Sequence, residues 1–185
     1  MKRHLAIGLC LLLLSACSSW KQVGGREGYV FRGFSVDIPS HWMQLDTDRY
    51  LLLSRDGPFL QYILVQQFSV DRSFQNTKKS FREGMLPQEA AEVVVDDMTS
   101  DRALRNFHLL ASGPVPVDGH DGFRLVFTYQ NPDGLTYKTL YYGFIAGGTF
   151  YSIRYNAAER HYFEKDLGTF QQVLSSFHIA PGMTT

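Results

Sequence analysis

The chain has 185 residues and equal numbers of basic and acidic side chains, 18 Lys plus Arg and 18 Asp plus Glu. This balance argues against a nucleic-acid partner, because phosphate binding requires clustered Lys and Arg. Both cysteines, Cys10 and Cys17, lie near the start, which excludes a disulfide or a cysteine metal site in the rest of the chain. Ten Tyr and fourteen Phe, many in alternating runs, indicate a core rich in β-strands.

The first residues have the pattern of a secretory signal. Lys2 and Arg3 precede an apolar run over residues 5–14. The run is too short for a membrane-spanning helix, which needs about 20 apolar residues. The sequence Leu14-Ser15-Ala16-Cys17 follows, and it resembles the lipobox of bacterial lipoproteins. The alternative is an ordinary signal peptide that happens to contain a cysteine.

The lipobox resemblance implies a processing route. The Cys17 sulfur would receive a diacylglyceryl group, the signal (residues 1–16) would be cut between Ala16 and Cys17, and the new amino terminus would be acylated. Cys10 lies inside the apolar run and would be removed with it. In Gram-negative bacteria, a residue other than Asp after the lipidated cysteine favours the outer membrane. Ser18 occupies that position, so we expect an outer-membrane anchor with the chain facing the periplasm.

A tether and a single domain are expected after the cleavage site. Residues 17–28 are polar and contain Gly without an apolar period, which predicts a flexible tether. Residues 29–180 are long enough for one domain with a real core. Alternation of apolar and polar side chains predicts a strand over 34–38. Further strands are expected over 50–54 and 60–70.

The middle of the chain contains the first predicted helix. Residues 71–85 are polar and mixed, and we expect a loop with a short helical piece there. Pro87 suits a first helical position, and a helix is predicted over 88–104. Its apolar stripe consists of Ala91, Val94, Val95 and Met98. A strand over 107–112 follows, and Gly113-Pro114 predicts a turn after it.

The last third predicts an antiparallel meander and a closing helix. Phe123, Leu125, Phe127 and Tyr129 recur at every second position and would share one face of a strand. Turn sequences at 131–134 and 147–148 predict two hairpins. The helix that closes the chain presents large apolar side chains at spacings of three and four, namely Phe163, Leu167, Phe170, Leu174 and Phe177. This stripe is expected to pack on the sheet, and docking on a partner is the alternative.

The order of these elements resembles the PsbP-like fold, which includes bacterial lipoproteins of the DcrB type. The resemblance is carried by F-S-V-D-I-P-S-H-W, residues 34–42, and by the closing helix Y-F-E-K-D-L-G-T-F-Q-Q-V-L-S-S-F, residues 162–177. It covers residues 28–179. It implies an α+β fold, an antiparallel β-sheet packed by helices. It also implies a binding or assembly role without shared catalytic residues, so no active site is carried over. The photosynthetic roles of some members are not transferred.

Candidate catalytic and metal-binding residues are scattered. The histidines show no metal-binding spacing, so neither a metal site nor a cofactor is expected. His120-Asp121 is the best local pair, but adjacent turn residues point apart. Ser40-His41 lacks the elbow motif of nucleophilic serines. The alternative to a binding module is therefore an envelope hydrolase that uses His41 or His120.

Tyrosines of the predicted meander are candidates for a binding surface, because Tyr is favoured at interfaces. The candidates are Tyr141, Tyr142, Tyr151 and Tyr155. Neighbours such as Tyr141 and Tyr142 must face opposite sides of a sheet, so part of the set would be core. We predict a membrane-anchored envelope lipoprotein that acts as a non-catalytic binding or assembly module. Its partner would be an envelope protein, a peptide or a glycan.

Overall fold

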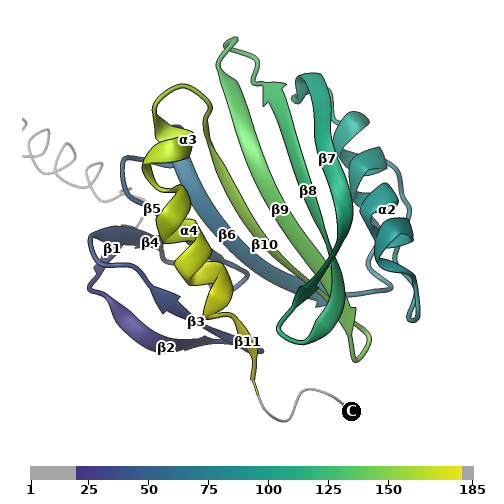
Figure 1. Cartoon of the computed structure of the whole chain (residues 1–185), viewed down its shortest axis with the longest axis horizontal. Coiled ribbons are helices and arrows are strands. Elements are labelled where there is room, and N and C mark those ends of the chain that lie inside the picture. The colour runs from purple at the N-terminus through teal and green to yellow at the C-terminus, as the bar shows by residue number, and fades with distance from the viewer. Residues whose placement is uncertain (1–19, 181–185) are drawn as a thin grey trace, which may run out of the picture.

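A computed structural model describes residues 20–180, and an eight-stranded antiparallel sheet is the centre of the fold (Figure 1). The order of strands across this sheet is β1-β4-β5-β6-β10-β9-β8-β7. Their bounds are β1 Trp20–Val23, β4 Trp42–Leu45, β5 Leu51–Ser54, β6 Gln61–Ser69, β7 Arg105–Val117, β8 His120–Gln130, β9 Thr136–Ala146 and β10 Thr149–Ala158. Within the described residues, no helix is both long and apolar enough to cross a membrane.

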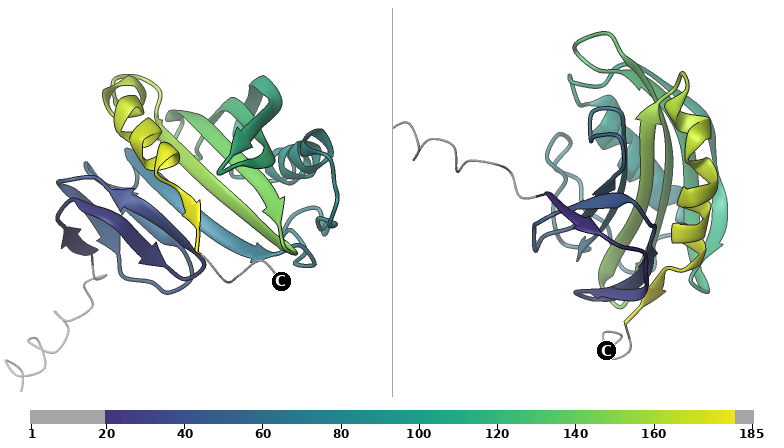
Figure 2. Two further views of the ribbon diagram at one scale, coloured as in Figure 1. Left: turned by 60° about the horizontal axis from the view of Figure 1, so that its bottom comes forward. Right: turned by 90° about the vertical axis from the view of Figure 1, so that its left-hand side faces the viewer.

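A three-stranded sheet and the helices cover the two faces of the large sheet (Figure 2). The small sheet has the order β11-β3-β2, with bounds β2 Arg26–Phe31, β3 Phe34–Ile38 and β11 His178–Ile179. The helices are α2 Pro87–Thr99, α3 Tyr162–Lys165 and α4 Leu167–Ser175. One buried cluster joins α4 and the small sheet to one face, and a second joins α2 to the other. The expected α+β fold, an antiparallel sheet packed by helices, is confirmed.

Most of the predicted strands and both hairpins are present. The alternation at residues 34–38 corresponds to β3, whose apolar side chains are all buried. The predicted strand 60–70 is β6, and the predicted meander forms β8, β9 and β10 in antiparallel register. Trp42, at the end of the motif that carries the fold resemblance, is 1% exposed and packs in the α4-side core.

The predicted tether is wrong beyond residue 19. Trp20–Val23 forms β1 and pairs with β4, with Val23 opposite Trp42 and buried in the core. Residues 26–28 belong to β2. Gly24 and Gly25 lie between these two short strands. Each strand is too short to show a clear alternation of apolar and polar side chains in the sequence.

Two further boundaries differ from expectation. The strand predicted to stop at a Gly113-Pro114 turn continues as β7 to Val117. β7 is the edge of the sheet, so a proline in it does not remove a ladder bond from a central strand. The helix predicted over 88–104 ends at Thr99, where Asp101 accepts the Ala103 N–H at 2.9 Å and starts a turn. Residues 71–86 form a loop with turns and without the expected helical piece.

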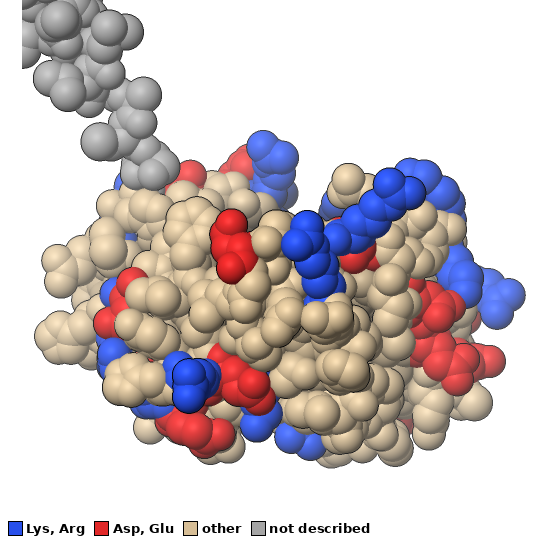
Figure 3. All heavy atoms as spheres, turned by 90° about the horizontal axis from the view of Figure 1, so that it is seen from above, with Lys and Arg blue, Asp and Glu red and all other residues tan. Residues whose placement is uncertain are grey.

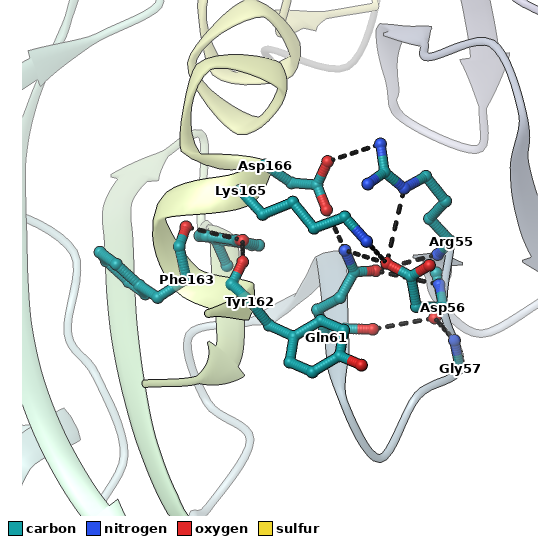
Figure 4. A network of polar contacts seen from close by, with 10 residues as sticks. Arg55, Asp56, Gly57, Gln61, Tyr162, Phe163, Lys165 and Asp166 are labelled. Carbon is teal, nitrogen blue, oxygen red and sulfur yellow. Dashed lines mark hydrogen bonds and ion pairs between the residues drawn. The ribbon is translucent and has the colours of Figure 1, made fainter. Parts of the chain in front are cut away.

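The closing helix is broken at Asp166, and a polar cluster explains the break (Figure 4). The Asp166 carboxylate is 1% exposed and accepts hydrogen bonds from Arg55, at 2.9 Å, and from the Gln61 side chain. Lys165 binds the neighbouring Asp56 at 2.8 Å. These contacts pull residues 165–166 toward the β5–β6 turn, which a continuous helix would not allow. The heptad-like spacing could not reveal this because the partners are more than a hundred residues away.

Gly143 marks a close approach in the α2-side core and gives a first testable prediction. A Cβ at Gly143 would lie 2.6 Å from Phe123 Cζ and 2.9 Å from Phe150 Cζ. The aromatic rings are buried, so Gly143→Ala should lower the free energy of unfolding by about 1–3 kcal/mol. Gly113→Ala is the matched control, because nothing lies within 4 Å of its Cβ. Urea unfolding of both variants checks the prediction, and equal stabilities would contradict it.

Candidate functional site

A cavity of about 330 Å³ lies between the large sheet and the elements that cover its α2 side. Strands β6, β8, β9 and β10 provide its floor. Its walls come from residues 72–76 of the loop that follows β6 and from residues of α2 and the turn after it. Its volume lies at the small end of the range for ligand pockets, about 300–1,000 Å³.

Strand alternation determines which side chains reach this floor. In β10, Arg154 lies opposite Leu64 of β6 and Tyr141 of β9, and paired residues share a face. Asn156, two residues further on, points to the same side and also lines the cavity. Tyr155, between them, points to the opposite face and is fully buried against α4.

Arg154 is the only basic residue of the strand floor, and its charge has no carboxylate counterpart. Its Nε atom is buried without a hydrogen-bond partner among the described residues. No Asp or Glu of residues 20–180 lies within ion-pair distance of its guanidinium. The guanidinium lies over the Tyr62 ring, 5.4 Å from the centroid, which compensates the charge in part. Arg154 is therefore a half-buried cation with one buried N–H donor that has no partner among the described residues.

Neutral hydrogen-bonding groups surround Arg154. The Tyr129 hydroxyl donates to Asn156 Oδ1 at 3.1 Å, and the Thr139 hydroxyl donates to the same atom at 2.7 Å. Because both donors occupy the oxygen, the amide nitrogen of Asn156 remains as a donor. Burial raises the pKa of Tyr129 and of Tyr141, so both phenols stay protonated at neutral pH.

The acidic residues at the cavity wall are already engaged. Asp97 of α2 accepts the backbone N–H groups of Asn76 and Thr77 at 2.9 and 3.1 Å. Asp101 accepts the Ala103 N–H. The Asp97 bonds hold the loop against the helix, and neither Asp97 nor Asp101 forms an ion pair with Arg154.

A second basic side chain, Arg72, lies at the edge of the cavity. Its guanidinium is 5.0 Å from the centroid of the Phe68 ring, and the residue is exposed to solvent. On the face drawn in Figure 3, basic and acidic side chains are interspersed over the surface. Water therefore compensates the surface charges, in contrast to the charge of Arg154.

The four candidate tyrosines do not form one surface. Tyr141 lines the cavity, with 3% of it exposed. Tyr151 and Tyr155 are buried in the core on the opposite face, and Tyr155 donates to the backbone oxygens of residues 162 and 163. Tyr142 is half-buried and packs near the Phe170 ring. Register thus divides the four side chains between the two faces of the sheet, and of the four only Tyr141 lines the cavity.

The two candidate histidines lie outside the cavity and far from each other in the fold. His41 is exposed in the turn between β3 and β4. His120 begins β8 and stacks on the Phe144 ring at 5.3 Å. In the part of the chain that the structure describes, neither ring has a hydrogen bond to a Ser, Asp or Glu side chain, and no cluster of metal-ligating residues is found. The cleavage site Ala16 and the lipidation candidate Cys17 lie outside the described residues.

Sequence reasoning missed Arg154 and Asn156. Ser152, Arg154 and Asn156 are polar residues at alternating positions, and they share the face of β10 that lies toward α2. A signal was available, because an arginine between Ile153 and Tyr155 would be partly desolvated if that strand lay inside the sheet. The cavity itself depends on the loop 71–86, whose path no local pattern predicts.

Comparison with known proteins gives matches over most of the chain. The family model described as PsbP matches residues 28–179. No curated protein sequence matches. The solution structure of cyanobacterial PsbP (CyanoP) from Synechocystis is 15% identical, with a TM-score of 0.56, covering 90% of this chain and 96% of that one.

Two other solved structures extend the comparison. The Ran-binding protein Mog1p of Saccharomyces cerevisiae is 12% identical, with a TM-score of 0.56, covering 91% of this chain and 100% of that one. LpqN of Mycobacterium tuberculosis, described as involved in cell envelope biogenesis, is 12% identical, with a TM-score of 0.50, covering 80% and 83%. At such identities the likeness establishes the fold.

Proposed function

The chain belongs to the PsbP family, and from that premise we propose that it is a lipid-anchored module of the bacterial envelope that binds a ligand or partner without catalysing a reaction. The observation that carries the binding role is the open cavity on the α2 side of the sheet, with an unpaired cation on its floor. Ligand sites are concave and combine apolar side chains with a few polar groups, as this cavity does.

The groups around the cavity support binding in preference to catalysis. Arginine keeps its proton at all physiological pH values. The raised pKa values of Tyr129 and Tyr141 make both phenols poor proton donors in a reaction. The carboxylates of Asp97 and Asp101 are held by backbone N–H groups. These groups are suited to orient a ligand through hydrogen bonds.

The lipobox supports the anchor, and the fold limits how far the domain can stand from the membrane. Only Ser18 and Ser19 separate Cys17 from β1. Three extended residue steps span at most about 11 Å. A lipidated Cys17 would therefore hold the β1–β4 edge of the sheet close to the bilayer. We infer from Ser18 that this bilayer is the outer membrane, with the domain in the periplasm.

Substitution of Cys17 tests the anchor. The full chain, expressed in a Gram-negative host supplied with an alkyne fatty acid, should be labelled on the mature protein. Cys17→Ser should lose the label, because the one other thiol, Cys10, follows Leu9 inside the apolar run and has no lipobox before it. Cys10→Ser is the matched control and should be labelled as the wild type is. Labelling of Cys17→Ser at the wild-type level would reject the lipoprotein assignment.

Photocrosslinking tests the binding role. A benzophenone amino acid at Gln66, which lines the cavity, should give a specific adduct when the anchored full chain is irradiated in cells. The same group at Gln171, which is exposed on α4, is the control and should give no such adduct. Equal crosslinking at both positions, or none at Gln66, would count against a binding function of this cavity.

A further inference from the structure

The half-buried guanidinium of Arg154, whose Nε is buried and has no partner among the described residues, points to a missing partner. A charged group in the interior is strongly unfavourable unless another charge or several hydrogen bonds compensate it. The Tyr62 ring offers one favourable contact, and the described Asp and Glu residues offer none within ion-pair distance. The guanidinium is planar and presents paired N–H donors, a geometry that fits a carboxylate with two parallel hydrogen bonds. An anion entering the cavity would supply the absent counter-charge.

Charge balance favours a single negative charge over a double one. Arg154 supplies one positive charge at the floor, and the phenols and amides near it are neutral. Asp97 and Asp101 at the wall repel any anion, and they repel a doubly charged one more strongly than a singly charged one. Arg72 is exposed at the edge, where solvent weakens its attraction. A carboxylate matches this balance, whereas a phosphate monoester, close to two negative charges, would leave one charge uncompensated.

The remaining lining defines the rest of the ligand. Phe68, Phe74 and Phe127 contribute aromatic surface around the polar floor. The volume, about 330 Å³, corresponds to roughly ten water molecules at about 30 Å³ each. A ligand of about ten non-hydrogen atoms, acidic at one end and apolar at the other, fits both the size and the lining.

We propose that the cavity binds a small organic acid, with its carboxylate on the Arg154 guanidinium and the Asn156 amide and its apolar body against the phenylalanine rings. The proposal rests on the binding role above and specifies the chemical class of the ligand. Arg154 is thus the specificity-determining residue, because it distinguishes an acid from its neutral amide.

Ligand-observed NMR tests the proposal on the full chain in lipid nanodiscs, with empty nanodiscs as the blank. The probes are benzoate, 3-phenylpropionate and octanoate. We expect saturation transfer to at least one of these acids and at least tenfold weaker binding of its neutral amide. Phenyl phosphate should also bind at least tenfold more weakly than the best acid. Failure of all three acids to bind, or equal binding of acid and amide, would overturn the proposal.

Variants of arginine assign the effect to one side chain. Arg154→Met should weaken acid binding at least tenfold, and Arg154→Lys should weaken it less because the charge remains while the paired donors are lost. Arg124→Met is the matched control, since Arg124 is exposed on the opposite face of the sheet, and it should bind the acid as the wild type does. Unchanged acid binding by Arg154→Met would overturn the proposal.

Thermal unfolding separates a binding role from a structural one. Replacing this half-buried cation by an apolar side chain of similar length breaks no ion pair among the described residues and removes the desolvation cost of the charge. The Tm of ligand-free Arg154→Met should therefore equal or exceed that of the wild type. A clear fall in Tm together with unchanged acid binding would make Arg154 a structural residue and reject the proposal. If the acids fail to bind while Gln66 still gives its specific crosslink, the binding role stands and the ligand class is wrong.

Discussion

Replacing Arg55 with Met is expected to lower the free energy of unfolding by about 3–5 kcal/mol. Arg55 binds Asp166 at 2.9 Å, and the Asp166 side chain is 1% exposed, so the substitution would leave a buried carboxylate without its cation (Figure 4). The Gln61 side chain would still donate to Asp166, which places the loss at the lower end of this range. Urea unfolding at neutral pH measures the difference.

The same variant should show a characteristic pH dependence. Burial raises the pKa of Asp166 above its ordinary value of 3.8, and the Arg55 charge opposes that shift. Without Arg55 the pKa rises further, so the folded variant holds a proton that the unfolded chain has released. Its stability then falls as pH rises through the window between the unfolded and folded pKa values. The difference between wild type and Arg55→Met should shrink as the pH falls from neutral through the raised pKa of Asp166 in the folded variant.

Lys165→Met is the matched control for this cluster. Lys165 binds Asp56 at 2.8 Å, but both side chains are about 30% exposed, at 32% and 29%. Water would hydrate the carboxylate left behind, so the loss should stay within about 1 kcal/mol. An Arg55→Met variant that loses no more than Lys165→Met, or whose loss does not depend on pH, would contradict the role given to this cluster.

Phe170→Ala should be nearly as costly, with an expected loss of about 3–5 kcal/mol. Phe170 is fully buried and stacks on Tyr155, with ring centroids 5.3 Å apart. Removing the ring would leave a cavity between α4 and the sheet that the surrounding strands cannot close. Gln171→Ala, on the exposed face of the same helix, should change stability by less than about 0.5 kcal/mol. Similar losses from both variants in urea unfolding would show that α4 is not packed as described.

The apolar periodicity of the chain predicted the fold because it is a local property. The stripe of the closing helix placed Phe163, Phe170 and Phe177 on one face, and all three are buried in one core. The same periodicity could not predict the break at Asp166, because the side chain of Asp166 binds Arg55 and Gln61, which lie in another part of the chain. Boundaries set by distant partners are invisible to local patterns.

The candidate site was less accessible from the sequence than the fold. Tyr141 was identified from its amphipathic character and does line the cavity. Tyr151 and Tyr155 are equally amphipathic but pack on the opposite face of the sheet. Only the strand register shows which tyrosines face the cavity and which face the other core. Arg154 was missed because an isolated arginine in a strand has no motif. Arg154 is notable because no carboxylate of the described residues lies near it in space. The sequence does not show which residues are near it, and the fold does.

The central claim is that the chain is an anchored binding module whose ligand lies on Arg154. Native mass spectrometry of the full chain extracted from bacterial membranes tests it most directly. We expect a mature chain that begins at Cys17, carries covalent lipid, and holds a small acidic ligand that dissociates on activation. The ligand should be missing from Arg154→Met while the lipid remains. A wild-type chain without lipid, or one whose bound species is retained unchanged in Arg154→Met, would contradict the account.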